Sequence, residues 1–217
     1  MCLGLKATTD EIDQYLDIMA RMGNIGSFTF AQQASQAERL FSAGVLAVGI
    51  RKDNFAEYNA FMQSIKPLFG SSDEAGTAIQ QIMNYLKIRS SDIEKKVGFK
   101  LFDKNGAIID FEKTIKAISK LSVQERSKIF GEQARAFLAF DTEDGIKKFE
   151  EFISKGKETG FIADALERKM KGPKFQINAL TTAIKELADA GLTPIITELT
   201  TKLRDLTSNP EKMAEFR

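Results

Sequence analysis

The sequence of 217 residues contains no histidine and no tryptophan, and its only cysteine is Cys2. Without histidine there can be no Ser-His-Asp triad, no Cys-His dyad and no imidazole metal ligand. One cysteine cannot form a disulfide or a thiolate metal cluster within the chain. The composition therefore excludes several large classes of enzymes and metalloproteins, and a free thiol fits a reducing compartment.

The sequence also lacks long apolar runs and a strong charge of either sign. No run approaches the ~20 apolar residues that a membrane span needs, and residues 1–6 do not have the pattern of a signal peptide. Lysine and arginine number 31 against 30 acidic residues, a formal net charge of +1. We therefore expect balanced, solvated helix faces and no direct nucleic-acid binding.

Most of the chain has apolar residues at helical spacing, interrupted by glycine and proline. Thr8-x-x-Glu11 and Ser122-x-x-Glu125 have the spacing of capping boxes. The other expected helix starts are Thr29, Asp53, Ser72, Ser91, Asp110 and Thr142. The sequence thus predicts an all-α protein, with mostly short helices in a compact multi-helix bundle.

Two segments carry a β signal. Residues 44–50 form an apolar run that could be a buried strand, although its continuity with the preceding helical spacing favours a helix. Asn105-Gly106 lies between two apolar stretches, and both residues tolerate positive φ. We therefore expect one small β-hairpin near residues 99–110. The glycine there is in the wrong place for a calcium-binding EF-hand loop, which favours the hairpin.

Charged residues occur in pairs, but their spacing is poor for catalysis. Neighbouring acids on an amphipathic helix face solvent rather than opposite sides of a cleft. This applies to the acid pairs Asp141/Asp144 and Glu150/Glu151. The lysine pairs Lys95/Lys96 and Lys147/Lys148 could contact phosphates, but each lies near an acid, so a solvated face is again favoured. The sequence has no P-loop and no dinucleotide-binding fingerprint. We expect no enzyme, no cofactor, and no catalytic, cofactor-binding or metal-binding residue.

Phenylalanine is abundant, with seventeen residues against three tyrosines. The rings could form an exposed surface for partners, or they could fill the core. Phe137/Phe140 and Phe149/Phe152 recur at helical spacing with polar residues between them. This pattern favours the core for most of them.

The last part of the chain has a different pattern. Two heptad-like runs, each of about two heptads, meet near Gly191, and Thr193-Pro194 starts a new helix or kinks a long one. We divide the chain into a compact helical core module, residues 1–172, and an amphipathic heptad-like segment, residues 173–217. Asn209-Pro210 begins a helix that the sequence does not complete, so we expect the chain to be a piece of a longer polypeptide.

Several short segments occur in a recognisable order. They are Gly4 to Glu11, Ser71 to Ala78 with Ala75-Gly76-Thr77 at its centre, the Asp103-Lys104-Asn105-Gly106 turn, Leu121-Ser122 with Glu125-Arg126, and Ile129-Phe130-Gly131. In this order, and with Pro194 in the C-terminal segment, they resemble the core region of tail tape measure proteins of long-tailed phages and prophages. The resemblance covers the chain from about Leu5 to Leu206. It assigns a structural role to Ala75, Gly76, Thr77, Asn105, Gly106, Phe130, Gly131 and Pro194.

The resemblance implies a structural protein of the phage tail. Tape measure proteins set tail length, occupy the tail tube during assembly and leave ahead of the DNA. The implied partners are the tail tube and the tail assembly chaperone or tip proteins, with possible self-association through residues 177–206. The implied location is the virion, after assembly in the host cytoplasm, with membrane contact only on ejection. The alternatives are a membrane-active helical module that assists DNA entry, a generic helical interaction scaffold, and a cell-wall hydrolase.

Overall fold

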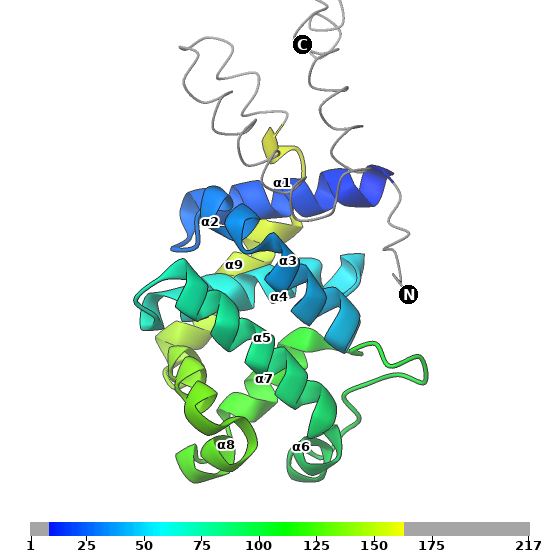
Figure 1. Cartoon of the computed structure of the whole chain (residues 1–217), viewed down its shortest axis with the longest axis vertical. Helices are drawn as coiled ribbons and strands as arrows, with labels where there is room; N and C mark the ends of the chain where they lie inside the picture. The colour runs from blue at the N-terminus through cyan, green and yellow to red at the C-terminus, as the bar shows by residue number, and fades with distance from the viewer. Residues whose placement is uncertain (1–8, 163–217) are drawn as a thin grey trace, which may run out of the picture.

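A computed structural model describes residues 9–162 of the chain (Figure 1). Helices account for 78% of the interpretable residues, and no strand occurs among them. The predicted all-α class is therefore confirmed. The α-helices are α1 (Thr9–Ile25), α2 (Phe30–Ser35), α3 (Ala37–Phe41), α4 (Lys52–Ile65), α5 (Ser72–Ile88), α6 (Ser90–Val97), α7 (Phe111–Ser119), α8 (Val123–Phe130) and α9 (Glu143–Lys157). Three further helical segments are the π-helix η1 (Ser42–Ala47) and the 3₁₀ helices η2 (Lys66–Leu68) and η3 (Gly131–Phe140).

Side-chain caps begin four of these helices, α2, α7, α8 and α9, at the residues that the sequence predicts. Ser122 forms a full capping box with Glu125 at the start of α8. Asp110 accepts the Lys113 N–H at the start of α7, and Thr142 accepts the Gly145 N–H at the start of α9. Each cap satisfies a backbone donor that has no partner within its own helix, which is why these polar residues mark helix starts.

Three predicted caps are displaced by one or two residues. One of them is Ser91, which is the second residue of α6, after the cap position at Arg89. The cap of α5 is Ser71, whose hydroxyl accepts the Glu74 N–H, and Ser72 is the first helical residue. Arg51 precedes α4, and Asp53 lies inside the first turn. An acid in the first turn still interacts favourably with the positive end of the helix dipole.

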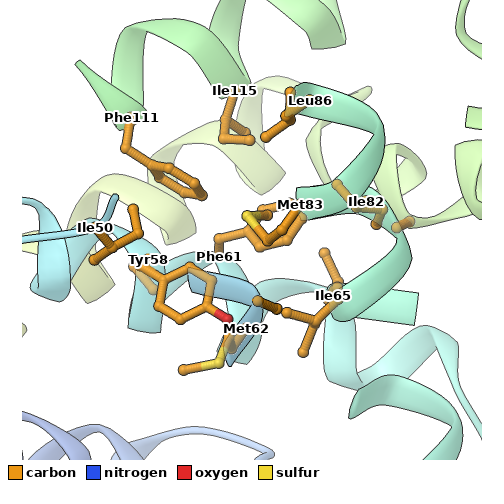
Figure 2. Close-up of a cluster of buried hydrophobic side chains, with 14 of the residues drawn as sticks. Ile50, Tyr58, Phe61, Met62, Ile65, Ile82, Met83, Leu86, Phe111 and Ile115 are labelled. Atoms are coloured by element: carbon orange, nitrogen blue, oxygen red, sulfur yellow. The ribbon is translucent and has the colours of Figure 1, made fainter. Parts of the chain in front are cut away.

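The helix α4 lies at the centre of the fold (Figure 1). Ten of its fourteen residues are buried, and it packs against α1, α7, α9 and η3. Figure 2 shows Phe61, Met62 and Ile65 of α4 among Ile82, Met83 and Leu86 of α5 and Phe111 and Ile115 of α7. One apolar core thus joins residues from Tyr15 in α1 to Ile153 in α9.

Phenylalanine rings make up much of this core. Ten of the fifteen described phenylalanines are buried, and the other five are partly buried. The Phe61 ring lies 5.8 Å from the ring centroids of both Phe111 and Phe140 and 6.3 Å from that of Phe137. Such edge-to-face and offset pairs are favourable beyond the area that they bury. The core interpretation of the phenylalanines is confirmed for the described residues.

The apolar run 44–50 is not a strand, and its first residues, up to Ala47, belong to the π-helix η1. A Cβ at Gly44 would lie 2.7 Å from the Tyr58 ring, so glycine permits this close approach. The Tyr58 hydroxyl donates to the Leu40 carbonyl at 2.8 Å, just before the widened turns. Gly49, with φ +66°, then ends the helix, as predicted.

The predicted β-hairpin near residues 99–110 is wrong. Phe102 and Ile108 form only an isolated antiparallel bridge. Two backbone bonds flank this bridge, from the Ile109 N–H to the Leu101 carbonyl and from the Asp103 N–H to the Ala107 carbonyl. The reciprocal donors do not pair across the turn, because the Leu101 N–H donates to the Glu94 carboxylate at 3.0 Å and the Ala107 N–H to the Asp103 carboxylate at 2.9 Å. The turn itself is present, since the Gly106 N–H donates to the Asp103 carbonyl at 3.0 Å. Side-chain carboxylates therefore take two of the backbone donors that a continued ladder would need.

Within the described residues, no helix is long and apolar enough to cross a membrane. The predicted boundary at residue 172 lies outside the described residues, as do the heptad-like segment 173–217 and Pro194.

Candidate functional site

The Ala75-Gly76-Thr77 segment forms a joint between α5 and the junction of α2 and α3. Ala75 is fully buried, and a Cβ at Gly76 would lie 2.9 Å from Gln36 Oε1. Arg39 Nη1 donates to Gln36 Oε1 at 2.8 Å and to Thr77 Oγ1 at 3.2 Å. Glycine at position 76 thus lets the polar end of Gln36 approach the backbone of α5 closely.

The Asn105-Gly106 turn is attached to the other end of α5. The Asp103 carboxylate accepts the N–H groups of Ala107 and Asn105 at 2.9 and 2.8 Å, and these bonds lower the pKa of Asp103. Gly106 has φ +78°, a conformation that favours glycine. Its carbonyl accepts a hydrogen bond from Lys87 Nζ at 2.9 Å, and the same ammonium lies 4.5 Å from the centroid of the Phe102 ring.

Phe130-Gly131 forms the third joint. The Phe130 ring is fully buried, 4.7 Å from the Phe137 ring and 6.4 Å from the Tyr85 ring of α5. Gly131 turns the chain from α8 into η3 with φ +57° and ψ −134°. A Cβ there would meet nothing within 4 Å, so the backbone conformation, and not space, requires glycine.

The three segments contact different residues of α5, and each joins a different neighbour to that helix. Their residues therefore act in packing. Within residues 9–162 there is no group of three or more Cys, Asp or Glu residues that could hold a metal ion. Pro194, the remaining predicted residue, is outside the described residues.

The acid pair Asp141/Asp144 has two different environments. Asp144 is exposed in the first turn of α9. The Asp141 carboxylate instead accepts hydrogen bonds from both terminal nitrogens of Arg126, at 2.5 and 3.0 Å. The Arg126 side chain is only 5% exposed, and it also donates to the Phe137 carbonyl at 3.2 Å. The solvent-facing interpretation fits Asp144 but misses this ion pair between α8 and the end of η3.

The other predicted charge pairs lie on helix surfaces, where they form local contacts. Lys96 pairs with Glu125 at 2.7 Å and Lys147 pairs with Glu143 at 2.9 Å. Glu150 pairs with Lys116, and Glu151 is exposed. Pairs of this kind contribute about 0–1 kcal/mol each. They do not form an acid/base arrangement.

The polar residues that the sequence analysis missed are on α4. Glu57 is only 8% exposed, and burial raises the pKa of its carboxyl. Lys157 Nζ of α9 lies 3.2 Å from its Oε1, and the Glu112 N–H of α7 donates to its Oε2 at 3.4 Å; both contacts act to lower that pKa. Glu57 therefore joins three helices at one buried carboxylate.

A second buried polar group on α4 holds the loop between α1 and α2. Gln63 Nε2 donates to the Phe28 carbonyl at 2.8 Å, and Gln63 Oε1 accepts the Phe28 N–H at 2.7 Å. Asn59 Nδ2 donates to Gln33 Oε1 at 2.8 Å, and Gln33 Nε2 donates to the same Phe28 carbonyl at 2.8 Å. Asn59 and Gln63 are one helical turn apart, which puts them on one face, but their spacing alone does not reveal that this face is buried.

No family model matches the sequence, and neither a curated protein nor a solved structure matches it.

Proposed function

We propose that this chain is a structural module of the tape measure protein of a long-tailed phage or prophage. The observation that supports this proposal best is the use of the motif residues as joints. Ala75-Gly76-Thr77, Asn105-Gly106 and Phe130-Gly131 occur in the family order, and each connects α5 to another part of the fold. A structural role for these residues explains why small and turn-forming types occupy them.

The buried polar groups also support a scaffold. Glu57 joins α4, α7 and α9, Gln63 holds the loop at Phe28, and Arg126 joins α8 to Asp141. The hydrogen-bonding partners of these groups are other parts of the same fold. Buried polar contacts of this kind specify one arrangement of helices rather than activate a substrate.

The shape suggests which part of a tape measure protein this is. A single helix of the 154 described residues would be about 230 Å long. Here the chain turns back repeatedly around one core, so these residues add little to the length of a ruler. We infer that the module occupies one position in the tail, in contact with the tail tube or with the assembly chaperone or tip proteins, and that extended helices elsewhere set the length.

The test is to look for the protein in tails of the phage or induced prophage that encodes it. Mass spectrometry of purified tails should detect peptides from residues 9–162, and antibodies against this part should label tails rather than heads. In-frame deletion of residues 9–162 should shorten assembled tails by far less than about 230 Å. Shortening by the full helical length would contradict a compact module.

A protein that is absent from tails would contradict the tape measure proposal itself. If such a protein instead permeabilised liposomes, it would be a membrane-active module. If it did neither, a generic helical scaffold would be the better description. Sedimentation of the full chain, compared with a variant carrying Leu199→Asp and Leu203→Asp, would test self-association through residues 177–206.

A further inference from the structure

The chain from Gly156 to Ile162 is held closely against α1 and α4. Gly156 lies in the last turn of α9, where a Cβ would be 3.1 Å from the Ala56 Cβ and 3.5 Å from the Met22 sulfur. The next residue, Lys157, pairs with the buried Glu57 of α4 at 3.2 Å. The end of α9 is therefore packed tightly on both helices.

Beyond α9, one arginine of α1 holds the following residues. Arg21 Nη1 lies 2.9 Å from Glu158 Oε2, and Arg21 Nη2 donates to the Thr159 carbonyl at 3.0 Å. The same guanidinium lies 5.2 Å from the centroid of the Phe161 ring. The Arg21 side chain is only 12% exposed, and it contacts three residues of the segment.

Asp17, one turn earlier on α1, completes the attachment. Its Oδ1 accepts the Ile162 N–H at 2.7 Å, and its Oδ2 lies 3.8 Å from Arg21 Nη2. Between these contacts Gly160 has φ +84°, and a Cβ there would meet nothing within 4 Å. Glycine thus allows the bend that brings Phe161 and Ile162 back onto α1.

The attachment differs in kind from that of α9. The helix α9 buries Phe149, Phe152 and Ile153 in the core. Residues 158–160 are exposed and have no comparable apolar contact, so polar groups and one ring hold the segment. Segments with few buried apolar contacts open at lower free energy than the elements beside them.

We propose that residues 158–162 form a releasable latch on Asp17 and Arg21 of α1, which detaches as a unit while α9 stays packed. When the latch is closed, residues 158–162 lie against α1, and when it is open, they are detached from Asp17 and Arg21. The proposal rests on contacts within the fold and holds whether or not the protein belongs to a phage tail.

The charged groups around the latch decide which conditions open it. Glu158 faces Lys155 of α9 and Arg21 of α1, and both lower the pKa of its carboxyl. Asp17 faces Arg21, and Lys157 faces Glu57 and, through it, Glu112 of α7. Protonation of Glu158 removes the partner of Arg21, so acid opens the latch at a pH below the ordinary pKa of glutamate. Salt screens the ion pair between Arg21 and the exposed Glu158, and it weakens this contact more than the packing at the buried end of α9.

Hydrogen exchange of the full chain, read by mass spectrometry, tests the latch directly. In Arg21→Met, which keeps the apolar stem, exchange in residues 158–162 should rise at least about tenfold, the effect of losing one charge-assisted hydrogen bond. Exchange in α9 and α4 should stay at the level of the unchanged protein. The variant Glu158→Gln, at an exposed position, should give a smaller rise in the same segment.

Arg135→Met is the matched control, because Arg135 also pairs with a glutamate, Glu74, and lies 4.5 Å from the centroid of a phenylalanine ring, that of Phe69. It should leave exchange in residues 158–162 unchanged. Unchanged exchange there in both Arg21→Met and Glu158→Gln would overturn the proposal. Equal loss of protection in α9 would also overturn it, since the segment would then open only with the helix.

A fluorescence titration gives an independent measurement. The chain has no tryptophan, so Phe161→Trp places a single fluorophore on the latch. Its emission should shift to the red as the pH falls below 4.5, before the helical circular dichroism signal is lost. A shift that coincides with global unfolding at every salt concentration would contradict a separate latch.

Discussion

The side-chain amide of Gln63 binds both backbone groups of Phe28. It donates to the Phe28 carbonyl at 2.8 Å and accepts the Phe28 N–H at 2.7 Å, although the two residues are 35 positions apart in the sequence. Phe28 lies in a loop, and its ring is fully buried. The Gln63 side chain of α4 thus forms the two hydrogen bonds that a neighbouring backbone would otherwise make with the N–H and carbonyl of Phe28. The loop between α1 and α2 is consequently part of the core.

Replacing Gln63 with Leu should destabilise the protein by about 2–3 kcal/mol, because the buried Phe28 N–H then has no acceptor. The Phe28 carbonyl keeps its bond from Gln33 at 2.8 Å, which limits the loss. Urea denaturation would measure the change in the free energy of unfolding. Gln81→Leu, at an exposed position of α5, is the control and should change it by less than about 0.5 kcal/mol. Equal effects of the two substitutions would show that the Phe28 contacts contribute little.

Replacing Gly98 and Gly49 with alanine, one at a time, should separate the cost of backbone strain from the cost of steric overlap. Gly98 has φ +81° and open space around its Cβ position, so Gly98→Ala should cost about 1 kcal/mol from conformation alone. Gly49 has φ +66°, and its Cβ would lie 2.7 Å from the Ala107 Cα. The loss of stability in Gly49→Ala should therefore be larger than that in Gly98→Ala by about 1–3 kcal/mol. Thermal denaturation of both variants measures this difference, and similar values would mean that the loop at Ala107 moves away readily.

The Arg126–Asp141 pair should show strong non-additivity. Asp141→Ala leaves the buried Arg126 guanidinium without its carboxylate and should cost about 3 kcal/mol or more. Adding Arg126→Met should recover part of this loss, because the uncompensated charge is then absent. A double-mutant cycle of unfolding free energies measures the coupling. Additive effects would indicate that the pair is largely solvated.

Acid should destabilise the protein through Glu125. Hydrogen bonds from Lys96 and from Ser122 lower the pKa of its carboxyl from 4.5 to about 2. A carboxyl whose pKa is lower in the folded state stabilises that state above pH 4.5, and the contribution is lost as the pH falls from 4.5 to about 2. NMR titration of the Glu125 carboxyl should place its midpoint in this lower range. Glu125→Gln should flatten the pH dependence of stability there, whereas a midpoint near 4.5 would contradict the contacts with Lys96 and Ser122.

Glu57 should change the stability with pH in the direction opposite to Glu125. Burial raises the pKa of its carboxyl, so the folded state disfavours the ionised form. Lowering the pH through this raised pKa therefore adds stability through Glu57, down to the pKa that the group has in the unfolded chain. In Glu57→Gln this gain should be absent from a series of denaturation curves between pH 7 and 4.5. An unchanged gain would mean that another group is responsible.

Local signals in the sequence determined much of the secondary structure. Ser122, Asp110 and Thr142 start helices where their side chains predict it, because a cap depends only on residues within one turn. Gly98 and Gly49 end helices for the same reason, since positive φ is a property of a single residue. The spacing of Phe137/Phe140 and Phe149/Phe152 also predicted their burial.

The predicted hairpin failed because its local signal was incomplete. Asn105-Gly106 does form a turn, but the Leu101 and Ala107 N–H groups donate to the carboxylates of Glu94 and Asp103, so the ladder does not extend. Likewise Asp141 was expected to face solvent, and only the position of Arg126 across the fold makes it an ion-pair partner. In both cases a side-chain contact that the local pattern does not reveal decided the outcome.

The sequence by itself determined the helical class, several helix starts and ends, and much of the apolar core, because each depends on neighbouring residues or on a simple period. Only the tertiary structure decided that α4 is buried on nearly all sides, with Glu57, Asn59 and Gln63 inside. A polar side chain is stable in the core when a partner meets it there, and these partners come from α2, α9 and the loop before α2. The same holds for Asp17 and Arg21, which become an attachment point only because the end of α9 brings residues 158–162 against α1.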